Sequence, residues 1–198
     1  SHDLRNMLSV ATLVADRLES SEDPTVQRIA PKLVASLNRA INLTEATLAF
    51  GRAEEPAPKL DRVALRDLVD DVIDNDKLAS DGTHITYSCD VPGNVMVRAD
   101  PEQLHRVLSN LVRNARQAIA ATGKPGDVHV RGAETADGWV IEVSDTGPGL
   151  PKKAIDHLFQ PFHGGARKGG TGLGLAICAE LIRGHGGRLE LANSGPSG

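Results

Sequence analysis

The chain has 198 residues, a formal net charge of −4, 40% hydrophobic and 24% charged residues, and only 3% aromatics. This composition is typical of a globular protein with a core of Leu, Val, Ile and Ala, and the negative balance argues against nucleic acid as a partner. Cys89 and Cys178 lie far apart without metal-ligand spacing, so we expect two small buried thiols in a reducing compartment. The sequence has no run of 18 or more apolar residues and no signal-peptide pattern, which leaves any membrane anchoring unknown.

The first fifty residues predict two helices joined by a loop at 20–24. The first helix has apolar residues at heptad spacing, and the second has them at helical spacing: Leu4, Met7, Ala11, Val14 and Leu18, then Val26, Ile29, Leu33, Leu37, Ile41 and Leu48. Two amphipathic helices cannot bury their apolar faces alone. We therefore expect residues 1–52 to be a helical hairpin that pairs with a second copy as the four-helix bundle of a homodimer.

Residues 51–59, rich in Pro, Gly and Glu, predict a linker, and residues 60–198 predict a second domain. Within it we expect helices at 65–78, 101–121, 152–158 and 173–183, hairpins formed by 84–89 with 95–99 and by 128–134 with 139–144, and a strand at 188–192. Asp100 as N-cap and Pro101 at the first helical position mark the start of the second of these helices. The predicted fold class is α+β, a helical hairpin followed by an α/β sandwich.

Three segments of the second domain have the residue types that a nucleotide needs. Asn110 and Asn114 are four apart on one helix face, where an amide oxygen can ligate Mg²⁺. Asp145 follows a strand and precedes Gly147 and Gly149, so its carboxylate can accept a hydrogen bond from an adenine amino group.

The third segment, residues 170–174 (Gly-Thr-Gly-Leu-Gly), precedes a helix whose N-terminus favours phosphate. Each pattern alone is common in surface helices, turns and glycine-rich loops. Their order and spacing together are far more specific. No Gly-Lys-Ser/Thr follows the glycines, so they do not form a Walker loop.

Together the segments resemble the N, G1 and G2 boxes of the Bergerat-fold ATP-binding domain, and residues 158–162 (Leu-Phe-Gln-Pro-Phe) resemble its F box. The N-terminal helix with Ser1-His2-Asp3 resembles the H box of the sensor histidine kinases of two-component systems. The resemblance covers nearly the whole chain.

The resemblance implies a role for each matching residue. His2 is the implied phosphoacceptor, Asp3 the adjacent general base, and Asn6 the residue that positions a water for phosphatase activity. In a heptad that places Leu4 at position a, His2 takes the outward position f, where a mobile ATP domain and a partner can reach it.

The implied ATP-binding residues are Asn110 near the phosphates, Asn114 as Mg²⁺ ligand, Asp145 as reader of adenine with Gly147 and Gly149 beside it, and the lid residues Gly170, Thr171, Gly172, Leu173 and Gly174. Arg167 or Lys168 supplies a phosphate-neutralising charge. The sequence departs from many family members at Met7, where proline is usual. Residues 114–118 (Asn-Ala-Arg-Gln-Ala) resemble the nitrogen-sensor subgroup.

These features predict a cytoplasmic catalytic portion of a longer protein that uses ATP and Mg²⁺ to phosphorylate His2 and passes the phosphoryl group to an aspartate of a response-regulator receiver domain. Three alternative functions fit the sequence less well. An ATPase of the same fold has a water-activating Glu where this chain has Asn110. A scaffold with a decayed pocket would have lost the binding residues, and a serine kinase that regulates a sigma factor would lack the long histidine-bearing helix.

Overall fold

The computed structural model describes residues 23, 26, 27 and 29, and residues 56–79, 84–136, 138–161 and 172–195. The chain divides into two compact units, Ser1–Glu55 with Gln160–Gly174, and Pro56–Phe159 with Leu175–Gly198. Apart from those four positions, the predicted helical hairpin of residues 1–52 lies outside the described residues. The hairpin, its four-helix bundle and the predicted domain bounds of 1–52 and 60–198 therefore stay predictions.

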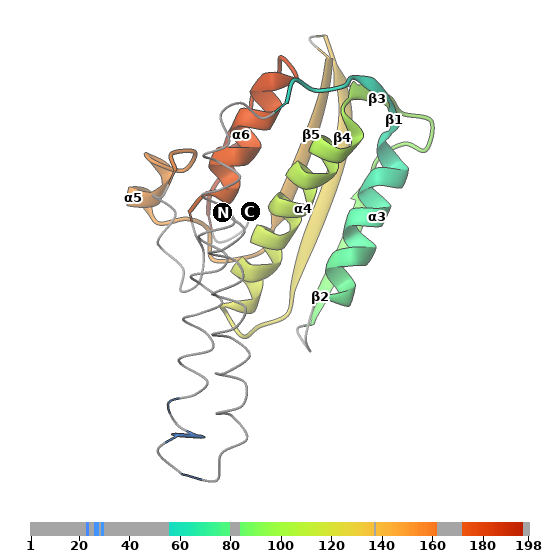
Figure 1. Cartoon of the computed structure of the whole chain (residues 1–198). Coiled ribbons are helices and arrows are strands. Elements are labelled where there is room, and N and C mark those ends of the chain that lie inside the picture. Colours follow the sequence, from blue (N-terminus) through green and yellow to red (C-terminus); the bar gives the residue numbers. More distant parts are fainter. Residues whose placement is uncertain are drawn as a thin grey trace. The chain divides into compact units, whose positions relative to one another are not determined.

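The second unit is an α+β fold, which confirms the predicted class. Its elements in chain order, with α6 beginning at the last residue of the first unit, are β1 (Asp61–Ala64), α3 (Leu65–Leu78), β2 (Ile85–Asp90), β3 (Met96–Ala99), α4 (Pro101–Ala120), β4 (Gly126–Thr135), β5 (Gly138–Asp145), α5 (Lys152–Ile155) and α6 (Gly174–Gly184) (Figure 1). The predicted helices at 65–78, 101–121 and 173–183 are confirmed to within a residue, and the helix predicted at 152–158 is the shorter α5.

The strands form a three-stranded sheet of order β2-β4-β5 and a separate pair, β1-β3. β4 and β5 are antiparallel, with Thr135 opposite Gly138 and Val128 opposite Asp145, which confirms the predicted second hairpin. β2 runs parallel to β4, and the connection between them contains α4, as a parallel pair requires. Figure 1 shows α3 and α4 lying across one face of the three-stranded sheet.

The predicted hairpin of 84–89 with 95–99 is wrong. β3 pairs instead with β1, a strand that the sequence analysis did not predict, with Asp61 opposite Ala99. Val91 and Val95 are both buried, and the carbonyl of Val95 accepts a hydrogen bond from the backbone N–H of Leu65 (3.1 Å). Burial of these two valines draws the segment into the core, where β3 meets β1 rather than turning back along β2.

The strand predicted at 188–192 is also wrong. These residues follow α6 without forming a strand, and no ladder hydrogen bond joins them to another strand in the described part of the chain. Alternating apolar residues give a strand only where a neighbouring backbone supplies hydrogen bonds.

α4 is the central helix of the unit. The Oδ1 atom of Asp100 accepts a hydrogen bond from the backbone N–H of Gln103 (3.0 Å), and Pro101 occupies the first turn, so the predicted helix start is confirmed. Its buried side chains pack against α3 and the sheet in a core of aliphatic residues: Val63, Leu65, Val69, Val72, Ile73, Leu104, Leu108, Val112, Ile119, Val128 and Val130. The core is aliphatic, as the low aromatic content predicts, and Tyr87 and Trp139 are only partly buried against it.

A partly buried polar network joins α3, α4 and β2. The carboxylate of Asp76 accepts hydrogen bonds at Oδ2 from the guanidinium of Arg116 (2.9 Å) and from the hydroxyl of Tyr87 (2.7 Å). The side chains of Asp76 and Arg116 are only 9% and 17% exposed. Burial and the Asp76 carboxylate raise the pKa of Tyr87 well above its ordinary value, so its hydroxyl remains a donor. The network thus fixes α4 to both of its neighbours.

Replacing Asp76 with Ala leaves the Arg116 charge and the Tyr87 hydroxyl without their shared acceptor. We expect the free energy of unfolding, measured by urea titration, to fall by about 3 kcal/mol. Asp74→Ala on the same helix is the matched control, because the ion pair of Asp74 with Lys77 (2.9 Å) is exposed and should contribute below about 1 kcal/mol. Equal losses in the two variants would contradict the role given to the network.

Candidate functional site

The candidate site begins with the two asparagines of α4. Asn110 and Asn114 are half-buried and one turn apart, beside the helix face that packs into the core. The Oδ1 atom of Asn110 accepts a hydrogen bond from the guanidinium of Arg113. Two amide side chains therefore share one edge of the helix, as the sequence predicts.

Asp145 is the last residue of β5 and lies on the inner face of the sheet. Its side chain is on the same face of β5 as those of Ile141 and Val143, which pack against the core, and it is half-buried. Its Oδ1 atom accepts a hydrogen bond from the backbone N–H of Gly147 (2.8 Å). Its other carboxylate oxygen, Oδ2, has no hydrogen-bond partner among the described residues. The carboxylate thus folds its own loop with one oxygen, while the second oxygen is an acceptor without a partner in the described part of the chain.

Gly147 brings this loop against α4. A Cβ atom on Gly147 would lie 2.5 Å from Oδ1 of Asp145 and 3.0 Å from the Cβ of Ala118, so the position has no room for a side chain. Ala118 is one helical turn after Asn114 on the same face of α4. The structure therefore brings the Asp145 loop and the asparagine-bearing helix face together, although they are distant in sequence.

Two further contacts hold the loop in place. The backbone N–H of Thr146 donates to the carbonyl of Asp127 (3.1 Å), and the Thr146 hydroxyl accepts from the backbone N–H of Asp127 (2.9 Å). Gly149 has a φ of 72°, a conformation that favours glycine, and a Cβ atom there would lie 3.1 Å from the backbone nitrogen of Gly195. Thr146 was not predicted as a site residue, because its only signal in the sequence is its place between Asp145 and Gly147.

This arrangement can be compared with known proteins. Residues 99–198 match the family described as "Histidine kinase-, DNA gyrase B-, and HSP90-like ATPase", which is half of the chain. The chain belongs to this family. The match spans α4, the Asp145 loop and α6, and the resemblance recognised in the sequence is confirmed.

Three relatives show where in this ATPase family the chain falls. It is 32% identical to the sensor-like histidine kinase SenX3 of Mycolicibacterium smegmatis, over 96% of the chain and 51% of SenX3. It is 30% identical to the sensory histidine kinase/phosphatase NtrB of Klebsiella oxytoca, over 98% of the chain and 56% of NtrB. The crystal structure of full-length ShkA in complex with AMPPNP matches with 25% identity and a TM-score of 0.65, over 99% of the chain and 44% of ShkA. The chain thus spans about half the length of the histidine kinases that it matches.

The remaining predicted site residues are only partly described. Gly172 has a φ of 69° and Gly174 is the first residue of α6, with the buried Leu173 between them. A left-handed residue just before a helix suits a glycine, as the lid motif of this ATPase family predicts. The other predicted residues lie outside the described part of the chain: His2, Asp3, Asn6, Lys168, Gly170 and Thr171.

α6 packs against the side of α4 that carries Asn110. The buried thiol of Cys178 donates to the carbonyl of Val107 (3.8 Å) and is close enough to Asn110 for a hydrogen bond. Burial raises the pKa of the Cys178 thiol to about 11, against the opposing charges of Arg106 and Arg113. The thiol therefore stays neutral, as a packing residue does, and the expected burial of Cys178 is confirmed, while Cys89 is half-buried.

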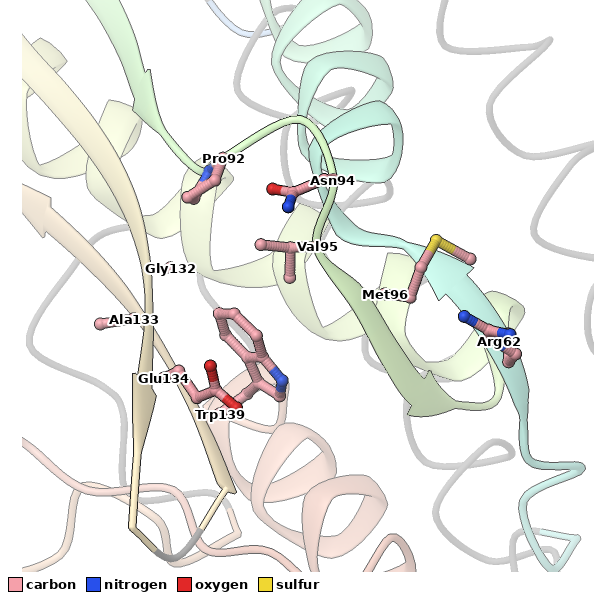
Figure 2. Close-up of a pocket in the computed structure, with 9 residues that line it drawn as sticks. All are labelled: Arg62, Pro92, Asn94, Val95, Met96, Gly132, Ala133, Glu134 and Trp139. Carbon is pink, nitrogen blue, oxygen red and sulfur yellow. The ribbon is translucent and has the colours of Figure 1, made fainter.

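A separate groove of about 610 Å³ lies between the β4–β5 hairpin and the segment leading into β3. Figure 2 shows the Trp139 indole projecting into it opposite Asn94 and Val95, with Arg62 at the far side. Its lining residues are Arg62, Pro92, Asn94, Val95, Met96, Gly132, Ala133, Glu134 and Trp139. None of them is a predicted nucleotide residue, so the groove is distinct from the candidate site.

Replacing Gly147 with Ala tests the close approach of the loop to α4. The added methyl group must displace either the Asp145 carboxylate or Ala118, and we expect a loss of about 2 kcal/mol in the free energy of unfolding. We also expect nucleotide affinity, measured by calorimetry with an ATP analogue, to fall about tenfold as Asp145 moves. Gly93→Ala is the control, because a Cβ there meets nothing within 4 Å. Wild-type stability and affinity in Gly147→Ala would refute the packing role.

Proposed function

We propose that this chain is the catalytic portion of an ATP-dependent protein-histidine kinase. The observation that carries the proposal is the half-buried Asp145 carboxylate, which keeps Oδ2 for a ligand beside the helix face that bears Asn110 and Asn114. Membership in the histidine kinase-like ATPase family and the identity with SenX3 and NtrB support it.

ATP binding follows from the chemistry of this site. Oδ2 of Asp145 accepts a hydrogen bond from the adenine amino group, which guanine lacks, while Gly147 and Gly149 let the backbone approach the base. Gly170, Thr171, Gly172, Leu173 and Gly174 form the lid at the phosphate end, with Lys168 neutralising phosphate charge. The ShkA structure contains AMPPNP, an ATP analogue, which supports a nucleotide of this class.

The site residues also fit Mg²⁺. No group of three His, Cys, Asp or Glu residues in the described part of the chain could hold a metal on its own. Mg²⁺ is commonly held by one or two protein oxygens together with substrate phosphates and water. The Asn114 amide oxygen is such a ligand and Asn110 faces the phosphates, so the ion would neutralise phosphate charge during transfer.

The reaction is in-line transfer to His2. Asp3 accepts the Nδ1 proton of the imidazole, which leaves the Nε2 lone pair to attack the γ-phosphorus of ATP. The bond from the γ-phosphorus to the bridging oxygen breaks, ADP leaves, and a phosphohistidine forms. Positioning and charge neutralisation supply most of the catalysis, because phosphoryl transfer needs little covalent help from the protein.

The phosphoryl group then passes from His2 to an aspartate of a response-regulator receiver domain. Asn6 positions a water for the reverse task, removal of phosphate from that regulator, and the printed name of NtrB, a kinase/phosphatase, supports this second activity. The protein works as a homodimer through the helices of residues 1–52.

Hydrolysis of ATP is the main alternative. A water-activating glutamate in the same fold would stand four residues before Asn114, and that position is Asn110. A neutral amide cannot take a proton from water at neutral pH, so transfer to a histidine is favoured. We also propose a cytoplasmic location for this portion. No helix among the described residues has both the length and the apolar character for a membrane crossing.

Asp145→Asn tests the adenine contact. An asparagine oxygen can keep the bond to the Gly147 N–H, but an NH₂ group replaces the acceptor Oδ2, so we expect ATP affinity to fall about 10- to 100-fold. Circular dichroism should be unchanged. Glu142→Gln, on the exposed face of the same strand, is the control and should bind ATP like wild type. Unchanged affinity in Asp145→Asn would refute the assigned role.

His2→Ala tests the phosphoacceptor. Incubation of the wild-type chain with γ-labelled ATP and Mg²⁺ should give a protein-bound label that is acid-labile and base-stable, as a phosphohistidine is. The variant should bind ATP but take up no label. Release of free phosphate without labelled protein, equal in both chains, would instead assign the protein to the ATPases.

A further inference from the structure

The segment that leads into the second unit, residues 56–59, is fastened to that unit by hydrogen bonds. The backbone N–H of Lys59 donates to Oδ2 of Asp100 (2.9 Å), and the side-chain amide of Gln103 donates to the carbonyl of Pro56 (2.9 Å). The ring of Pro58 lies close to Gly184, the last residue of α6. Residues 56–59 belong to the predicted linker, yet they are held against the beginning of α4.

Asp100 does two tasks at once. Its Oδ1 atom caps α4 by accepting from the backbone N–H of Gln103 (3.0 Å), while Oδ2 holds Lys59. These backbone N–H groups hold the pKa of Asp100 below its ordinary value, so the carboxylate stays ionised. Asp100 and Gln103 are the two polar side chains that are buried in the described part of the chain.

His185, just after the end of α6, is hydrogen-bonded to the backbone of Asp100 at the start of α4. Its Nδ1 atom lies 2.8 Å from the carbonyl oxygen of Leu181, which only accepts, so Nδ1 carries the proton. Its Nε2 atom accepts a hydrogen bond from the backbone N–H of Asp100 (3.0 Å). The start of α4, the end of α6 and the incoming chain are therefore connected through Asp100.

The attachment of residues 56–59 affects how long the flexible tether before the second unit is. Four residues freed from the unit would lengthen a flexible tether by up to about 13 Å, at roughly 3.3 Å per residue. Transfer between tethered groups depends on their effective concentration, which falls as a flexible tether lengthens beyond the distance it must span. The clamped end of α4 belongs to the same rigid helix as Asn110 and Asn114. Holding residues 56–59 thus fixes where the tether meets the helix that faces the nucleotide.

We propose that Asp100, Gln103 and His185 form a linker clamp that positions the ATP-binding unit for phosphoryl transfer. They are positioning residues, since none of them is among the residues assigned to the nucleotide. The proposal rests on the proposed kinase function. In it, ATP binding is independent of the clamp and the rate of transfer to His2 depends on it.

Asp100→Asn separates the two tasks of Asp100. Asparagine is as good an N-cap as aspartate and can still accept from Gln103, but its NH₂ group faces the Lys59 N–H and cannot accept from it. In the full 198-residue chain we expect hydrogen exchange at the Lys59 amide to rise about tenfold or more. We expect the autophosphorylation rate at saturating ATP to fall about tenfold, with the affinity for an ATP analogue unchanged.

Two further variants complete the experiment. Gln103→Leu removes the bond to Pro56 without touching Asp100, and it should raise exchange in the same segment and slow the same step. Asp61→Asn makes the same chemical change at a nearby exposed aspartate, whose carboxylate accepts, among the described residues, from the backbone N–H of Arg62 (2.7 Å). This control variant should leave Lys59 amide exchange, affinity for the ATP analogue and the autophosphorylation rate as in wild type.

Each outcome decides the proposal. Faster Lys59 exchange with a slower rate and equal affinity supports it. Faster exchange with an unchanged or higher rate overturns the positioning role, and unchanged exchange overturns the clamp itself. A wild-type chain that binds nucleotide but forms no phosphohistidine overturns the proposed function, and the positioning role with it. The exchange result stands apart from activity, so the two failures are distinguishable.

Discussion

The close approach of the Asp145 loop to α4 is the contact on which the candidate site depends. Gly147 lies against Ala118 with no space for a side chain, and Asp145 folds the loop by accepting from the Gly147 N–H. The strand places the carboxylate on the inner face of the sheet, and the glycine lets the loop lie directly against α4. Thr146 and the Arg116–Asp76–Tyr87 network then fix the loop and the helix to their surroundings.

The parts of the fold that the sequence predicted are those set by local patterns. Helical periodicity, the Asp100 cap with Pro101, and the turn near Gly138 depend on neighbours in sequence, and all three are confirmed. The failures concern pairing. β2 and β3 look like a hairpin locally, but burial of Val91 and Val95 sends β3 to β1, and residues 188–192 alternate without a partner strand among the described residues. Strand pairing depends on distant backbone, which local alternation does not specify.

The candidate site also divides into features set by local sequence and features set by distant contacts. Asn110, Asn114, Asp145, Gly147 and Gly149 were predicted as candidates from short, local spacings, and the structure places them on α4 and on the loop that contacts it. The hydrogen bonds that hold α4 in place could not be predicted from sequence, because their partners are distant. Asp76 and Arg116 are 40 residues apart, and Lys59 and Asp100 are 41 apart. The sequence alone does not indicate which aspartates of α3 are exposed and which are largely covered. Only the packed structure distinguishes Asp76, which holds Arg116, from the exposed Asp74.

The choice between hydrolysis and transfer follows from where the acceptor is. A hydrolytic site contains its own general base, and its acceptor is water from the solvent. Its rate is therefore determined within one rigid unit. Here the position of that base is the neutral Asn110, and the proposed acceptor, His2, belongs to the other compact unit. Under the proposed transfer to His2, the rate depends on how often the two units meet in a productive geometry. In the proposed kinase, the attachment of the chain to α4 therefore affects catalysis, and the buried Asp100 carboxylate, which accepts from both the helix N-terminus and the linker, is suited to fix that attachment.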